Sequence, residues 1–161
     1  DWSSDVCSSD LEEPPKVVIV EADTAACLYK SAVAGDGEPR AVGGDMPTIM
    51  AGLACGEANT ISWDILRNHA SAFVACPDWV SAKGMRTLAA PLAPDPQVKS
   101  GESGAVGLGL LAALCERTEY EKFKDAMGID ETSVVLMFST EGDTDPENYR
   151  QIVWDGKYPS C

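Results

Sequence analysis

The sequence predicts an α/β fold in which helices flank a mainly parallel β-sheet. Three short apolar runs, at residues 16–20, 72–75 and 134–138, are typical of strands, and helical patterns separate them. Strands that alternate with helices favour parallel pairing. The chain has 161 residues, of which 45% are hydrophobic. That is enough apolar material for the core of one domain of ordinary size.

The first elements follow from a β-branched run and from capping residues. Residues 16–20 come after two prolines and form a continuous run that is typical of a fully buried strand. A helix is expected over residues 25–34, with Asp23 or Thr24 as its N-cap, and the glycines that follow should end it. Residues 48–55, rich in small residues, are expected to form a short helix or an apolar loop.

The middle of the chain alternates between helix and strand. A helix is expected over residues 61–70, and the apolar run at 72–75 predicts a brief strand. Pro77 then suits the first turn of a helix that continues towards Ala89, because proline lacks the backbone N–H that this position leaves unpaired. Three further prolines stiffen the loop that follows.

A helix of small and apolar residues is expected over residues 104–116, and a charged helix over 118–127. The buried face of the first is marked by apolar residues spaced four apart, Val106, Leu110 and Leu114. Its glycines let it lie close to a sheet or to another helix. They resemble a dinucleotide-binding fingerprint, but that motif must directly follow a strand. The helix start at residues 100–103 offers free backbone N–H groups, which predicts a site for an anion.

The last predicted strand, residues 134–138, ends in two hydroxyls, Ser139 and Thr140. Open α/β sheets place their ligands at the carboxyl ends of strands, so these hydroxyls are the first candidates for ligand binding. Neutral hydroxyls suit the holding of a cofactor better than attack on a substrate. Beyond them, Asp145 and Pro146 predict the start of a final helix, as N-cap and first helical residue.

Charge and cysteine content exclude several classes of protein. The formal net charge is −14, so neither a nucleic-acid site nor a polybasic membrane patch is expected. No apolar stretch approaches the roughly 20 residues that span a bilayer. The six cysteines include no C-x-x-C pair, which argues against a zinc knuckle and favours reduced thiols in a cytoplasmic protein.

Metal and triad chemistry are also disfavoured. His69 is the only histidine, and its setting predicts an ordinary histidine on a helix face. Alternating acids begin at Glu141, but Pro146 and Ile152 occupy the positions at which a calcium loop needs glycine and glutamate. No metal site is therefore predicted.

Residues 1–11 differ from the rest of the chain. They have no helical or strand period, no start methionine, and neither the basic region nor the apolar core of a signal peptide. They resemble the translation of a sequencing adapter joined to a truncated gene. We expect a non-native leader at 1–11, and residues 12–161 to be part of a longer catalytic domain.

Several segments, in this order, resemble the pyridoxal-phosphate (PLP) enzymes of the tryptophan synthase β-like fold, fold type II. The stretches TIMAGLA, ESGA and STEGDTD resemble motifs of the dehydratases and of the tryptophan synthase β chain. Together, GDMPTIMAGLACGE, SGESGAV, FSTEGDTD and IVWDGKYPS are most similar to the diaminopropionate ammonia-lyase family. The resemblance runs from about residue 15 to residue 160 and implies the C-terminal part of that fold.

The resemblance implies where a PLP cofactor would lie. Ser139, with Thr140 as its neighbour, would meet the ring nitrogen, and the backbone at Ala51, Gly52 and Leu53 would line the cofactor face. In the family a lysine holds PLP as a Schiff base and a glycine-rich loop holds its phosphate, both upstream of this chain. None of the chain's seven lysines stands in a matching motif. No catalytic residue is therefore assigned, and the fragment alone is expected to be inactive.

The implied activity is the α,β-elimination of 2,3-diaminopropionate to pyruvate and ammonia. A serine is too weak an acid to protonate the ring nitrogen, and a neutral ring favours elimination over transamination. Two alternatives remain: a threonine or serine dehydratase of the same fold, and a non-catalytic α/β ligand-binding module. The family further implies a small amino-acid substrate and a cytoplasmic homodimer. If any two cysteines pair, the fold implies Cys27 with Cys55; otherwise the thiols are unpaired.

Overall fold

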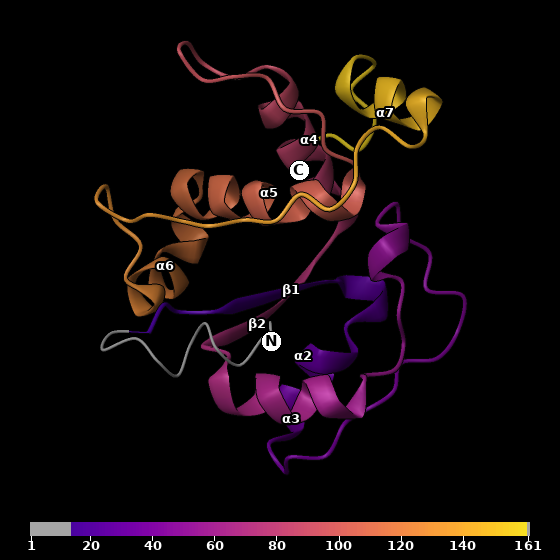
Figure 1. Ribbon diagram of the computed structural model, residues 1–161, viewed down its shortest axis with the longest axis vertical. Helices are drawn as coiled ribbons and strands as arrows, with labels where there is room; N and C mark the ends of the chain where they lie inside the picture. Colours follow the sequence, from indigo (N-terminus) through magenta and orange to yellow (C-terminus); the bar gives the residue numbers. More distant parts are fainter. Residues whose placement is uncertain (1–13, 161) are drawn as a thin grey trace, which may run out of the picture.

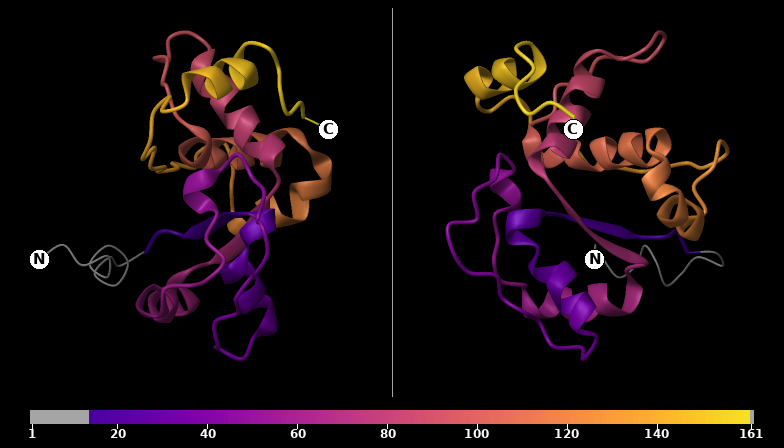
Figure 2. Two further views of the ribbon diagram at one scale, coloured as in Figure 1. Left: turned by 90° about the vertical axis from the view of Figure 1, so that its right-hand side faces the viewer. Right: turned by 180° about the vertical axis from the view of Figure 1, so that it is seen from behind.

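The computed structural model describes residues 14–160, and the expected leader at residues 1–11 lies outside this range. Two parallel strands form the sheet, β1 (Val18–Ala22) and β2 (Ala72–Cys76), with Val18 opposite Ala72 and Ala22 opposite Cys76. Figures 1 and 2 show helices on both sides of this sheet. The predicted parallel α/β arrangement is confirmed, with β1 beginning two residues later than expected. The expected full burial of residues 16–20 is wrong, because Lys16 is exposed and residues 17–20 are only partly buried in a sheet that has two strands within residues 14–160.

The predicted helices all form, with bounds that differ by at most a few residues. They are α2 (Cys27–Ala34), α3 (Thr60–His69), α4 (Asp78–Ala89), α5 (Glu102–Glu116), α6 (Glu121–Met127) and α7 (Pro146–Val153). Short 3₁₀ turns occur at η1 (Asp23–Ala25), η2 (Ala51–Leu53) and η3 (Thr118–Tyr120). Helices α2 and α3 cover one side of the sheet, and α4 to α7 lie on the other (Figure 1).

The strand predicted over residues 134–138 is not present, and its expected burial is wrong. The segment is extended, but no neighbouring strand pairs with it among residues 14–160. It runs along α5, as the orange coil in Figure 1 shows. Val134, Leu136 and Phe138 are 98%, 79% and 77% exposed. Burial of such a strand requires a neighbouring strand, and residues 14–160 provide none for it.

Two glycines determine how closely α4 and α5 pack. A Cβ built on Gly109 would lie 1.8 Å from the carbonyl oxygen of Val80, and one on Gly84 would lie 2.0 Å from that of Ala105. Both distances are far shorter than any real contact of a Cβ atom. The close approach predicted for the glycine-rich helix is thus made to another helix.

The N-terminus of α2 is capped from the end of β1. The predicted caps, Asp23 and Thr24, instead lie within η1, and no local side chain caps the helix. The carboxylate of Glu21, 7% exposed, accepts hydrogen bonds from the backbone N–H groups of Leu28 and Tyr29 at 3.0 and 2.7 Å. A negative charge here satisfies two unpaired donors and complements the positive end of the helix dipole.

The thiols of Cys27 and Cys55 are both free, so the alternative of unpaired cysteines is the one observed. Cys27 is buried and donates to Glu21 Oε1, with 3.6 Å between the atoms, whereas Cys55 is exposed. Cys76 at the end of β2 is also buried. Burial, together with the negative charge of Asp23, raises the pKa of the Cys76 thiol to about 12.

This raised pKa predicts a loss of stability at alkaline pH. The unfolded thiol ionises near pH 9, whereas the folded thiol keeps its proton until about pH 12. The free energy of unfolding should therefore fall as pH rises above 9, by at most about 1.4 kcal/mol per pH unit for this group. Urea unfolding between about pH 8 and pH 10.5 should show a shallower decline in Cys76→Ala than in the wild type. If the free energy of unfolding fell as steeply with pH in Cys76→Ala as in the wild type, the account would be contradicted. The control is Cys55→Ala, which removes an exposed thiol and should decline as the wild type does.

Candidate functional site

The start of α5 brings together the two segments that the sequence singled out. Ser139 lies with its Oγ 2.8 Å from the Oγ of Ser100, which is 0% exposed. Gly104 makes this approach possible, because a Cβ there would lie 2.7 Å from Ser100 Oγ and 3.1 Å from Ser139 Oγ. Ser139 as a whole residue is exposed, and its Oγ lies on the side that faces the start of α5.

The second segment, η2, reaches the same helix start. The backbone N–H of Gly52 donates to Ser103 Oγ at 3.1 Å. Ala51 and Gly52 are exposed, whereas Leu53 is partly buried and packs against the core. Residues 51–53 and Ser139 therefore border one region of surface, although they lie more than 80 residues apart in the sequence. Thr140 is exposed and makes no hydrogen bond to any residue in the range 14–160.

Glu141 occupies the anion site predicted at the start of α5. Its carboxylate accepts from the backbone N–H of Ser103 at 2.7 Å, and its carbonyl oxygen accepts from that of Gly101 at 3.1 Å. A side chain on Gly101 would collide with this residue, because a Cβ there would lie 2.8 Å from the Glu141 carboxyl carbon. The N–H groups are thus used to hold the turn that follows Ser139, and the prediction of a free anion site there is wrong.

An ion pair also holds the turn that follows Ser139. Lys99 donates to the carboxylate of Asp143 at 2.9 Å. This hydrogen bond lowers the pKa of Asp143 and raises that of Lys99. Further along, Asp145 caps α7 through the backbone N–H of Asn148 at 3.1 Å, and Pro146 is the first helical residue, both as predicted.

The surroundings of Ser139 are electrically neutral. Its hydroxyl meets Ser100 Oγ and, at 3.4 Å, the carbonyl oxygen of Glu141; within residues 14–160 no ionised side chain hydrogen-bonds to it. The Glu141 carboxylate is turned towards the helix start. The site therefore offers one neutral hydroxyl, able to donate to or accept from a single heteroatom. This fits the nitrogen of a pyridine ring, beside which it places no hydrogen-bonded charge.

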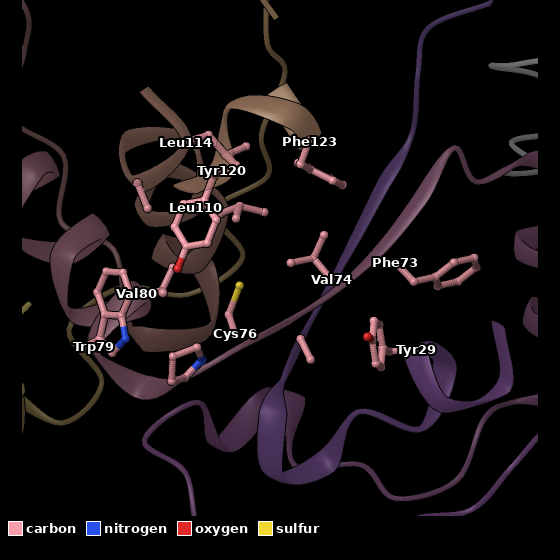
Figure 3. Close-up of a pocket in the computed structure, with 13 residues that line it drawn as sticks. Tyr29, Phe73, Val74, Cys76, Trp79, Val80, Leu110, Leu114, Tyr120 and Phe123 are labelled. Atoms are coloured by element: carbon pink, nitrogen blue, oxygen red, sulfur yellow. The ribbon is translucent and has the colours of Figure 1, made fainter. Parts of the chain in front are cut away.

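An apolar cavity of about 400 Å³ lies elsewhere, between β2, α5 and α6 (Figure 3). Aromatic side chains line much of it, among them Phe73, Trp79, Tyr120 and Phe123. None of the predicted site residues belongs to its lining. Sequence patterns did not indicate this cavity, because its walls come from elements distant in the chain.

The histidine and the acids do not form a further centre. His69 is the last residue of α3 and is exposed, as expected of an ordinary helix-face histidine. Within residues 14–160, no group of three His, Cys, Asp or Glu side chains is arranged to hold a metal ion. In the same range, no helix is long and apolar enough to cross a membrane.

Sequence reasoning missed two residues at this site, Ser100 and Glu141. Ser100 precedes the predicted helix by a few residues and was considered only for its backbone. Glu141 was considered as one acid among several in a polar turn. The pairing of both with partners about 40 residues away carries no local signal.

No protein-family profile matches the chain. It is 52% identical over 141 residues to the diaminopropionate ammonia-lyase of Escherichia coli (strain K12), and 50% identical over 147 residues to that of Salmonella typhimurium (strain LT2). These matches cover 88% and 91% of this chain, but only 35% and 36% of the relatives. The chain thus spans about a third of the length of the curated relatives it matches.

A solved structure agrees with these matches. The E. coli diaminopropionate ammonia-lyase in complex with an aminoacrylate–PLP azomethine reaction intermediate superposes with a TM-score of 0.78 at 49% identity, over 88% of this chain and 35% of that one. The expected fold class is confirmed, since such neighbours are PLP enzymes of fold type II. The chain therefore matches about a third of a diaminopropionate ammonia-lyase, both in sequence and in fold.

Proposed function

We propose that this chain supplies the ring-nitrogen side of the cofactor site in a PLP-dependent ammonia-lyase that converts 2,3-diaminopropionate to pyruvate and ammonia. The observation that carries the proposal is the hydroxyl of the exposed residue Ser139, which lies against Ser100 with no ionised hydrogen-bond partner among residues 14–160, in a chain 52% identical to such an enzyme. The named relatives favour this activity over a dehydratase or a non-catalytic module.

When bound, PLP withdraws electrons from the substrate's α-carbon, so that the α-proton and then the β-amino group can leave. Ser139 would hydrogen-bond the ring nitrogen without protonating it, and Thr140 would stand beside it. The backbone at Ala51, Gly52 and Leu53 would lie against the cofactor face. Glu141 would keep the turn in place through its contacts with the start of α5.

We propose that the amine that binds PLP comes from outside the described residues, because none of the seven lysines stands in a motif that resembles the family's lysine motif. Lys99 is the lysine nearest in sequence to Ser100, but it is ion-paired with Asp143, and this hydrogen bond raises its pKa. A lysine that attacks an aldehyde must first lose its proton. The ion pair favours the protonated, unreactive form of Lys99, and the part of the relatives that the match does not cover would supply the lysine.

Residues 134–138 also support the proposal that this chain works together with a further portion of a longer enzyme. Their backbone makes no hydrogen bond within residues 14–160, and four of their apolar side chains, Val134, Val135, Leu136 and Phe138, are exposed. An extended apolar segment with a free backbone is a template for another strand. We propose that residues 12–161 form the C-terminal portion of the catalytic domain, that this segment joins the sheet of the remaining portion, and that the whole enzyme is a cytoplasmic homodimer.

The test is a chimeric enzyme in which residues 14–160 replace the matching third of the E. coli ammonia-lyase. We expect it to show the absorption band of protein-bound PLP and to release pyruvate from 2,3-diaminopropionate. The 161-residue chain alone should show neither. A folded chimera that binds PLP but releases no pyruvate would refute the proposed activity.

A pair of variants tests the proposed strand contact in the same chimera. Phe138→Arg should abolish PLP binding there, yet change the stability of the isolated chain by no more than about 0.5 kcal/mol, because the side chain is already exposed. Leu92→Arg alters another exposed apolar residue, 85% exposed, and should leave PLP binding intact. If Phe138→Arg and Leu92→Arg had the same effect on PLP binding, the proposed contact of residues 134–138 with the remaining portion would be wrong.

A further inference from the structure

The residues that lead into η2 are fastened to the first turn of α4. One carboxylate oxygen of Asp78 accepts a hydrogen bond from the hydroxyl of Thr48 at 2.6 Å and another from the backbone N–H of Ile49 at 3.2 Å. Thr48 Oγ1 in turn accepts from the backbone N–H of Met50 at 3.1 Å. The Thr48 hydroxyl thus uses both its proton and a lone pair, and it ties this segment to a residue 30 positions further along the chain.

The charge and the place of Asp78 strengthen this contact. Asp78 is the first residue of α4, where a negative charge complements the positive end of the helix dipole. A hydrogen bond to an ionised acceptor is shorter and stronger than one between neutral groups, and the 2.6 Å from Thr48 is typical of a hydroxyl that donates to a carboxylate. Both residues are partly buried, which limits the competition from water.

The fastened segment leads directly to the backbone that borders the proposed cofactor region. Met50 is 0% exposed and belongs to the core, and η2 begins at the next residue. Beyond it, the backbone N–H of Gly52 donates to Ser103 Oγ at the start of α5. The turn η2 is therefore held from two helices, by Asp78 of α4 on one side and by Ser103 of α5 on the other.

We infer that Asp78 is a positioning residue that acts through Thr48 to hold η2 in the place where its backbone meets the cofactor. This inference rests on the proposed function, because it takes the exposed part of η2 to be the surface against PLP. A backbone that is already in place needs no ordering when the ligand binds. Without the link, η2 would occupy that place only part of the time, and the dissociation constant for PLP would rise in inverse proportion to that fraction.

The first measurement is the stability of the 161-residue chain, which needs no cofactor. Asp78→Ala and Thr48→Val should each raise the unfolding equilibrium constant roughly 10- to 100-fold, as expected for a hydrogen bond to a charged group. Because both variants remove the same bond, the double variant should raise it by clearly less than the product of the single effects. Effects that simply multiply would overturn the inference. Asp78→Asn, which keeps an acceptor oxygen without its charge, takes the place of Asp78→Ala if the alanine variant does not fold.

The second measurement uses the chimeric enzyme and the dissociation constant for PLP. Thr48→Val keeps the shape of the side chain without its hydroxyl, and should raise this constant by about 2- to 10-fold, with a change in the circular dichroism of the bound cofactor. Thr48→Ser keeps the hydroxyl and should restore the wild-type constant and spectrum. An unchanged constant in Thr48→Val, or the same rise in both variants, would overturn the role of the Asp78–Thr48 link.

Asn59→Ala is the control for a general loss of stability. The side-chain oxygen of Asn59 accepts from the backbone N–H of Ser62 at 3.0 Å and caps α3. Loss of this cap should raise the unfolding constant by about 2- to 30-fold, yet leave the dissociation constant for PLP unchanged. If Asn59→Ala weakened PLP binding as much as Thr48→Val does, the effect would come from stability alone and the positioning role would be wrong.

The two proposals can fail separately. If the chimera binds PLP and Thr48→Val binds it equally well, the role of Asp78 is overturned and the proposed function stands. If the chimera with no further substitution binds no PLP, the proposed function fails. The backbone amide chemical shifts of Gly52 and Leu53 in the 161-residue chain then decide whether Asp78 holds η2: they should move in Thr48→Val and return in Thr48→Ser, and unchanged shifts would overturn the inference.

Discussion

Gly109→Ala should destabilise the chain by about 3 kcal/mol, at the upper end of the usual range for overpacking. The added methyl would lie 1.8 Å from the backbone oxygen of Val80 and 2.7 Å from its carbonyl carbon. Neither atom can move aside as a flexible side chain would, so α4 and α5 must separate. That separation would loosen the core that includes Val80 and Val106. Urea unfolding monitored by circular dichroism measures the effect.

Gly107→Ala provides a matched control in the same helix. Its Cβ would lie 3.5 Å from the sulfur of Met137, an ordinary contact distance with a flexible side chain. Alanine also favours a helix over glycine by up to about 1 kcal/mol. This variant should therefore be as stable as the wild type or more stable. Equal destabilisation by the two variants would contradict the proposed packing of α4 on α5.

Ser139→Asp in the chimeric enzyme should lower the rate of elimination by about 10- to 100-fold, equivalent to about 1.4 to 2.8 kcal/mol in the barrier. A carboxylate beside the ring nitrogen would keep it protonated, because an adjacent negative charge raises the pKa of a basic nitrogen. Transamination should then increase relative to elimination. Steady-state release of pyruvate and the absorption spectrum of the bound cofactor measure the two effects.

The control for this variant is Ser139→Asn, which has nearly the shape of aspartate but no charge. If charge is the cause, Ser139→Asn should keep the wild-type ratio of elimination to transamination even if its overall rate falls. The ring-nitrogen assignment would be wrong if Ser139→Asp retained full activity and an unchanged spectrum. A loss of the same kind in both variants would indicate a steric effect rather than an electrostatic one.

Local signals predicted the helices well. Asp145 and Pro146 carry a complete helix start within two residues, and α7 begins there. The apolar spacing of α5 indicated its buried face: Val106 and Leu114 are buried, and Leu110 is partly buried. In each case the determining interaction lies within one turn or along one face of the same element, so the pattern along the chain contains it.

Signals that depend on distant partners were missed or misread. Residues 134–138 have the composition of a buried strand, but burial depends on a neighbour that is not among the described residues. The cap of α2 comes from Glu21 on the preceding strand, across an intervening turn. The pairing of Ser100 with Ser139 joins residues 39 positions apart. Such contacts depend on tertiary structure, and composition alone does not predict them.

The central claim is that Ser139 presents a neutral hydroxyl to an unprotonated ring nitrogen. The most direct test is the ¹⁵N chemical shift of ring-labelled PLP bound to the chimeric enzyme. We expect the shift of an unprotonated, hydrogen-bonded pyridine nitrogen, which should move towards that of a free nitrogen in Ser139→Ala. The shift of a pyridinium ion, or one that Ser139→Ala leaves unchanged, would contradict the account.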